Sequence, residues 1–147
     1  MSWAYIVLAL FAGIVVPVQA GLNAVLARHI GGPLNATFLS FLVGTGTLAV
    51  ILAAMRPALP SLAAFGSVPV WAYAGGLMGL IYVASATFLA PKLGAATLLA
   101  LVIAGQMLAS LVIDQYGLIG FPEHPITLFR VLGAALLVAG VVLIRAF

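Results

Sequence analysis

Polar side chains that could contact a ligand are few in this sequence, and they interrupt long apolar runs. Gln19 and Asn23 lie four residues apart, and Gln106, Ser110 and Asp114 follow the same spacing. On a helix, a spacing of four places side chains on one face. The Gln106 amide has donors and an acceptor that hydrocarbon cannot satisfy. These faces are therefore expected to turn toward other helices or a water-filled cavity.

Each of these polar groups has a structural interpretation beside a functional one. The candidates for a substrate pathway are Gln19, Asn23, Ser85, Gln106 and Ser110. The structural alternative is a seam of hydrogen bonds between helices, each worth about 0.6 kcal/mol on average. Asp114 is a candidate for proton or ion coupling. For Asp114 we favour the structural interpretation, a solvated or arginine-paired charge at the end of its helix.

The composition is that of an integral membrane protein. Of the 147 residues, 66% are hydrophobic and only 5% are charged, whereas a soluble domain has about 25% charged residues. The five basic residues are scattered and form no patch for nucleic acid. There is no cysteine, and the sequence contains no nucleophile–base set or cluster of metal ligands. We therefore predict no catalytic residue, no metal and no cofactor.

Five apolar segments are long enough to cross a bilayer, which takes about 20 helical residues. The sequence thus predicts an all-α integral membrane protein with one transmembrane domain over residues 1–147. The predicted spans are residues 3–27, 34–55, 69–90, 93–113 and 127–144. A short interfacial turn is expected near residues 61–65. The first span could instead be a signal peptide cleaved after Ala20, but no basic residue precedes it, so we favour a retained helix.

An odd number of spans places the two termini on opposite sides of the membrane. Two basic residues then fall on the N-terminal side and three on the other: Arg56 and Arg130 against Arg28, Lys92 and Arg145. This near-balance predicts no preferred orientation. Gly133 and Gly140 are seven residues apart and would open a groove for a partner helix. We expect a homodimer of oppositely oriented protomers packed through these glycines, with a parallel dimer as the alternative.

Three stretches of the chain carry a resemblance to a known family. They are PVQAGLNAVLARHIGGPLNATFLSFLVGT (Pro17–Thr45), GQMLASLVIDQYGLIG (Gly105–Gly120) and the following RVLGAALLVAGVVLI. With them, nearly the whole chain resembles the drug/metabolite transporter superfamily, and more narrowly its short, single-repeat YdcZ-type branch. Larger superfamily members hold two such five-helix units as an inverted pair. The last three helices also resemble those of the small multidrug exporters, and the Gly133…Gly140 spacing matches their dimer-forming helix.

The resemblance implies a multi-pass protein of the bacterial inner membrane that transports a small polar or amphipathic molecule by alternating access. Its partners would be the lipid bilayer and a second unit, either an antiparallel copy of itself or a paralogue. The first helix lacks the carboxylate through which the small multidrug exporters exchange protons. The resemblance therefore does not carry over that coupling mechanism or a preference for cationic drugs. The competing hypothesis is a non-transporting membrane subunit that packs on another protein.

Overall fold

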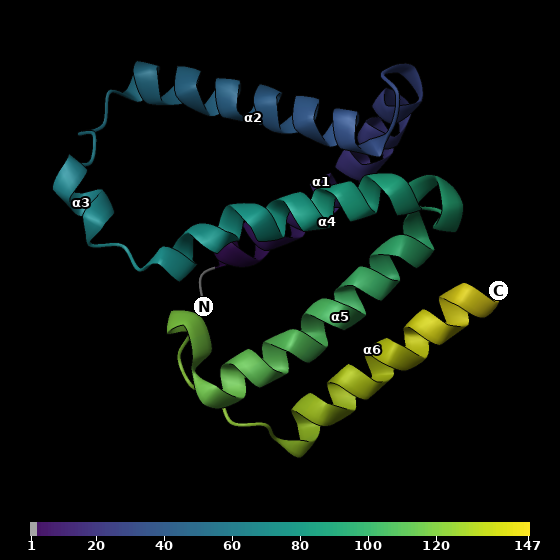
Figure 1. The fold of residues 1–147 in the computed structure, drawn as a ribbon. Coiled ribbons are helices and arrows are strands. Elements are labelled where there is room, and N and C mark those ends of the chain that lie inside the picture. Colours follow the sequence, from purple (N-terminus) through teal and green to yellow (C-terminus); the bar gives the residue numbers. More distant parts are fainter. Residues whose placement is uncertain (1–2) are drawn as a thin grey trace. The chain divides into compact units, whose positions relative to one another are not determined.

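The computed structural model describes residues 3–147, which form helices joined by short connections and contain no strand (Figure 1). Five helical segments are long and apolar enough to span a membrane, as the sequence predicts. They are α1 (Trp3–His29), α2 (Pro33–Met55), η1 with α4 (Val70–Tyr73 and Ala74–Leu93), α5 (Ala95–Tyr116) and α6 (Leu128–Ala146). The backbone groups into two compact units, one ending at Lys92 and one from Leu93 to Phe147. Each unit is described by itself.

The turn between α1 and α2 depends on glycine. Gly31 and Gly32 have φ angles of 85° and 122°, which side chains other than glycine rarely tolerate. The Asn35 Nδ2 group donates a hydrogen bond to the Ile30 carbonyl oxygen at 2.8 Å and closes the turn. Pro33 opens α2, where its missing N–H would have had no helical partner. The turn brings α1 and α2 side by side.

Small side chains fill the interior of the first unit. Its buried residues are Ala20 and Asn23 of α1, Ala36 and Thr37 of α2, and Val83, Ala86 and Thr87 of α4. The Thr37 and Thr87 hydroxyls donate to carbonyls of their own helices, at 2.8 Å and 2.7 Å. These threonines are therefore satisfied without another helix. Asn23 differs, because its hydrogen-bond partner lies on α2.

The connection from α2 to α4 contains a short helix, α3 (Leu62–Gly66), at the expected interfacial turn. Ser61 caps α3, since its side-chain oxygen accepts a backbone N–H of the first turn at 3.3 Å. The Tyr73 hydroxyl donates to the Phe65 carbonyl oxygen at 3.1 Å and joins α3 to η1. Trp71 is exposed. Aromatic side chains at the start of a span favour the interface between lipid and water.

The second unit is a pair of packed helices, α5 and α6. α5 continues to Tyr116, three residues beyond the predicted end at residue 113. Gly117 then adopts a left-handed conformation with φ of 56° and ends the helix. A single 3-10 turn, η2 (Leu118–Gly120), follows. α6 begins after Thr127, whose hydroxyl oxygen accepts the Arg130 N–H at 3.3 Å.

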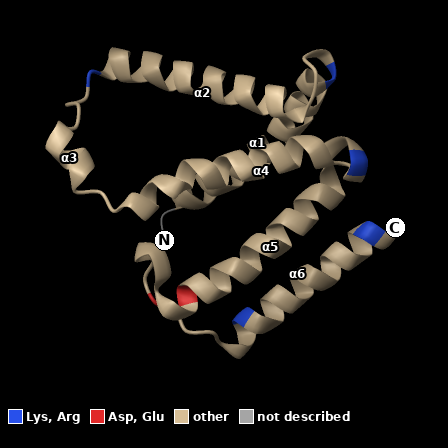
Figure 2. Ribbon diagram, in the orientation of Figure 1, with Lys and Arg blue, Asp and Glu red and all other residues tan. Residues whose placement is uncertain are grey.

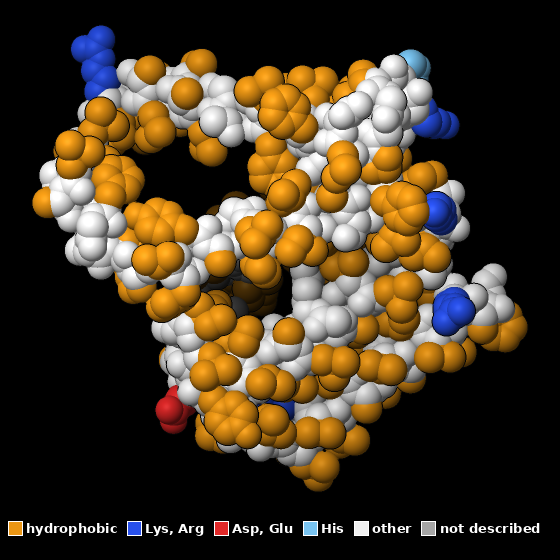
Figure 3. Space-filling model, viewed as in Figure 1, with side chains coloured by type: hydrophobic (Ala, Val, Ile, Leu, Met, Phe, Trp, Pro, Cys, Tyr) orange, Lys and Arg blue, Asp and Glu red, His pale blue; other side chains and the backbone are white. Residues whose placement is uncertain are grey.

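The surface distribution of side chains fits a bilayer. Basic and acidic residues lie at or just beyond helix ends (Figure 2), and apolar side chains cover the lengths of the helices (Figure 3). Phe11 and Leu22, both inside α1, are 61% and 66% exposed. A soluble protein rarely exposes such continuous apolar surface, whereas lipid covers it. The chain is a multi-pass membrane protein.

Candidate functional site

A groove of about 700 Å³ runs between α1 and α2, and we call it the α1–α2 groove. On α1 it extends from Val15 to His29, about 21 Å at 1.5 Å per residue. Its volume is in the range of small-molecule sites. Most of its walls are apolar, but Gln19, Asn23 and Ser40 place polar groups in its middle. The groove therefore combines an apolar channel with a central polar patch.

Asn23 is the most constrained polar residue of this groove. The Ser40 hydroxyl donates a hydrogen bond to the Asn23 side-chain oxygen, Oδ1. The Asn23 side-chain nitrogen, Nδ2, is buried and has no hydrogen-bond partner among the described residues. The whole residue is only 4% exposed. An unsatisfied buried donor costs about 1–3 kcal/mol, so its presence requires an explanation.

Asn23 also borders a narrow gap between α1 and α4. Across this gap lie Tyr82, Val83 and Ala86 of α4. The gap is too small to admit a water molecule, so water within it cannot satisfy the Asn23 nitrogen. A further hollow of about 440 Å³ extends along α2. Gln19 lines all three spaces, and Asn23 lines the α1–α2 groove and the narrow gap.

The structure thus brings two of the five predicted pathway residues together, Gln19 and Asn23. Ser85 is exposed on α4 and is not part of the α1–α2 groove. Gln106 and Ser110 belong to the second unit, where the Ser110 hydroxyl donates to the Gln106 carbonyl oxygen at 2.7 Å. Their convergence with the other amides stays a prediction. Ser40 is a site residue that sequence reasoning missed.

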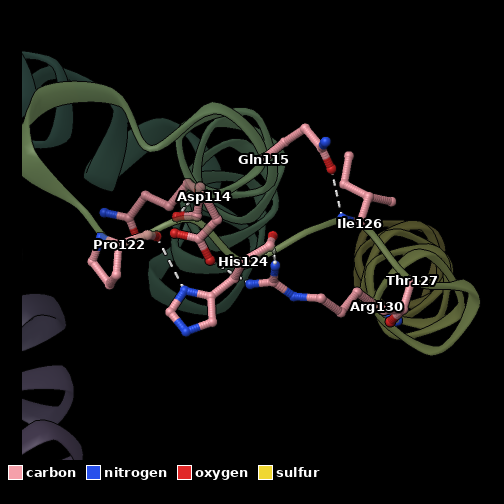
Figure 4. Close-up of polar contacts among 9 residues, drawn as sticks. Asp114, Gln115, Pro122, His124, Ile126, Thr127 and Arg130 are labelled. Atoms are coloured by element: carbon pink, nitrogen blue, oxygen red, sulfur yellow. Dashed lines mark hydrogen bonds and ion pairs between the residues drawn. The ribbon is translucent and has the colours of Figure 1, made fainter.

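Asp114 lies in a hydrogen-bonded cluster at one end of α5 and α6 (Figure 4). Its carboxylate forms an ion pair with the Arg130 guanidinium. Arg130 also donates to the His124 carbonyl oxygen at 2.6 Å, and the His124 N–H donates to the Asp114 carbonyl oxygen at 2.8 Å. The Gln115 side-chain oxygen accepts the Ile126 N–H at 2.6 Å. The ion pair is compatible with the arginine-paired interpretation of Asp114, and its role in coupling stays a prediction.

The predicted dimer glycines lie on an uncovered part of α6. A Cβ atom added at Gly133 or Gly140 would meet nothing within 4 Å. Beside them, α5 and α6 enclose an apolar groove of about 500 Å³ whose α6 wall includes Ala134 and Ala139. This face is open to another helix, and its role as a dimer interface stays a prediction. Residues 3–147 contain no group of three or more histidine or acidic side chains that could hold a metal ion.

Comparison with known proteins adds one finding. The model of the family described as "Putative inner membrane exporter, YdcZ" matches residues 4–143 of this chain. The match therefore covers helices of both units. No curated protein and no solved structure matches the chain.

Proposed function

The chain belongs to this YdcZ family of the inner membrane, and on that premise we propose that it carries a small polar or amphipathic molecule across the membrane by alternating access, as a dimer. It is a membrane transporter by family. The observation that best supports the finer proposal is the buried Asn23 amide, whose nitrogen lacks a partner beside the α1–α2 groove. Polar groups held inside membrane spans mark substrate pathways, because lipid cannot satisfy them.

A dimer would supply the second half of the pathway. Transporters of this architecture bind substrate where two oppositely oriented repeats meet. One chain provides a single five-helix unit, so two copies in opposite orientations would rebuild the pair. The uncovered Gly133 and Gly140 offer a close-packing face for the partner's α6. A heterodimer with an oppositely oriented paralogue meets the same requirement.

The second candidate is a non-transporting membrane subunit. The observation in its favour is that Ser85 and Gln106 are exposed on membrane-spanning helices. In a bilayer such groups favour another protein helix over lipid. A subunit that only packs on a partner would bind no small molecule in the α1–α2 groove. Ligand binding therefore separates the two candidates.

Thermal-shift screening of the purified protein against a library of metabolites and drugs tests the proposal. A ligand of the folded state raises the apparent stability, and above its Kd the rise grows with the logarithm of the ligand concentration. We expect compounds that stabilise the wild type and Thr37→Val but fail to stabilise Asn23→Leu. Thr37→Val is the matched control, because Thr37 is buried on α2 of the same unit and its hydroxyl is bonded within its own helix. If no compound stabilises the wild type, the subunit function is favoured instead.

A further inference from the structure

We propose that the α1–α2 groove takes an amphipathic molecule that presents a hydrogen-bond acceptor, neutral or anionic, to the Asn23 amide, and that it rejects lipophilic cations. This inference rests on the proposed function, since it names the substrate class of the same groove. Three features of the first unit support it: the free hydrogen-bonding groups, the charges and the shape.

The free hydrogen-bonding capacity of Asn23 is that of a donor. Its side-chain oxygen is already engaged by the Ser40 hydroxyl. Its side-chain nitrogen carries two N–H groups and has no partner among the described residues. An acceptor on a ligand, such as a carbonyl, carboxylate or phosphoryl oxygen, would satisfy that buried nitrogen once the side chain turns toward the groove. A quaternary ammonium has no acceptor and would leave it unsatisfied.

The charges of the first unit also disfavour a cation. The two acidic residues of the chain, Asp114 and Glu123, both belong to the second unit. A cation in the α1–α2 groove would therefore meet no carboxylate of its own unit. His29 lines one end of the groove, and Arg28 precedes it. Arg28 does not line the groove itself, but the charge beside this end is positive, so a charged ligand is better matched there as an anion than as a cation.

The shape of the groove sets the apolar part of the ligand. Asn23 lies six residues before His29, about 9 Å along the helix axis. Leu26, between these two residues, and Leu22, directly before Asn23, line the groove. A ligand with its acceptor at Asn23 can therefore lay an aromatic ring and a short alkyl chain along apolar walls. Three probes share such a body: 4-butylbenzoate, 4-butylbenzamide and 4-butylbenzyl-trimethylammonium.

The asparagine side chains report contact with these probes directly. The chain contains two asparagines, Asn23 and Asn35, so ¹⁵N-asparagine labelling gives two side-chain amide signals in an NMR spectrum of protein in nanodiscs. Asn35 is an internal control, because its amide already donates to the Ile30 carbonyl oxygen. We expect the benzoate and the benzamide to shift the Asn23 signal and leave the Asn35 signal unchanged. Equal shifts from the ammonium probe, or none from the acceptor probes, would overturn the inference.

Two substitutions at Asn23, measured by calorimetry, test whether the groove recognises an acceptor or a cation. Asn23→Leu removes the donors, and loss of such a hydrogen bond should weaken benzoate binding about tenfold. Asn23→Asp keeps the shape but supplies only acceptors and a charge, so it should lose the benzoate and gain the ammonium. Thr37→Val should bind like the wild type. Unchanged benzoate affinity in Asn23→Leu would overturn the inference even if Asn23→Asp fails to fold.

Transport of the same probes in proteoliposomes separates this inference from the proposed function. Transport of the ammonium but not the benzoate would overturn the substrate class and leave the transporter standing. Asn23 signals that respond to the acceptor probes, without transport of either, would support the substrate class and contradict transport. An Asn23 signal that shifts only with the protein-to-lipid ratio would assign the groove to a second copy of the chain and overturn the inference.

Discussion

The Asp114–Arg130 pair offers the sharpest test of the second unit, through Arg130→Met and Asp114→Asn. The side chain of Arg130 is 34% exposed and that of Asp114 is 23% exposed, so the pair lies between a buried and a surface ion pair. Exposed pairs contribute about 0.2–1 kcal/mol, and hydrogen bonds to charged groups about 1.5–3 kcal/mol when buried. For this partly exposed geometry we assign about 1 kcal/mol of unfolding free energy to each contact of the Arg130 guanidinium.

The two substitutions should not add. Arg130→Met loses the ion pair and the bond to the His124 carbonyl, about 2 kcal/mol of unfolding free energy on this scale. Asp114→Asn loses the ion pair alone, about 1 kcal/mol. The double variant should lose about 2 kcal/mol rather than 3, which gives a coupling energy near 1 kcal/mol.

Reversible unfolding in bilayers by steric trapping measures these free energies. Arg145→Met is the matched control, because Arg145 lies exposed at the other end of α6. We expect that control to change stability by less than about 0.5 kcal/mol. Equal losses of unfolding free energy in Arg130→Met and Arg145→Met, with additive effects of Arg130→Met and Asp114→Asn, would refute a stabilising role of the Asp114–Arg130 cluster.

The remaining predictions concern the dimer, the orientation and the two helix contacts. Gly133→Leu with Gly140→Leu should overfill the uncovered face of α6 and shift dimers to monomers in single-molecule photobleaching, whereas Gly46→Leu should not. A cysteine introduced at Phe147 should be labelled from both sides of the membrane if the homodimer is antiparallel, and from one side if it is not. Ser2, the corresponding N-terminal position, lies outside the described residues. Asn23→Leu with Ser40→Ala removes a buried unsatisfied donor, so the free energy of unfolding should stay unchanged or rise by about 1 kcal/mol. A loss above about 2 kcal/mol would instead mean that the Asn23–Ser40 hydrogen bond holds α1 and α2 together. Gly117→Ala should destabilise the second unit, because its Cβ would lie 2.7 Å from the Glu123 Cγ in a left-handed conformation.

The five spans could be predicted from the sequence because bilayer thickness fixes how long an apolar helix must be. The chain's few charges and its glycine–proline turns then mark where the helices end. Gly31-Gly32-Pro33 is such a mark, and α2 begins at Pro33. The C-terminal end of α5 is harder to predict from the sequence, because Asp114 and Gln115 are polar yet still helical. The Gln115 side chain bonds to the connection that follows and the Asp114 side chain pairs with Arg130 of α6, so polarity alone misplaces the helix end.

The candidate site could be predicted only in part. The spacing of Gln19 and Asn23 on one helix is a local property, so their shared face follows from the sequence. The contact of Asn23 with Ser40 is not local, because it depends on how α1 and α2 rotate about their axes when they pack. Ser40 lies on one helical face with Gly44 and Thr47. This shared face is the sequence signal that could have identified Ser40. Ala20 of α1 and Ala36 of α2 are both buried, and small residues such as these allow helices to approach closely.

The central claim is that the Asn23 side chain in the α1–α2 groove contacts the transported molecule. The measurement that tests it most directly is the initial rate of uptake into proteoliposomes, below saturation, of a compound that stabilises the wild type. At equal protein density, Asn23→Leu is predicted to lower the rate about tenfold through loss of a hydrogen bond, while Thr37→Val stays within about twofold of the wild type. Equal rates for Asn23→Leu and the wild type would contradict the claim.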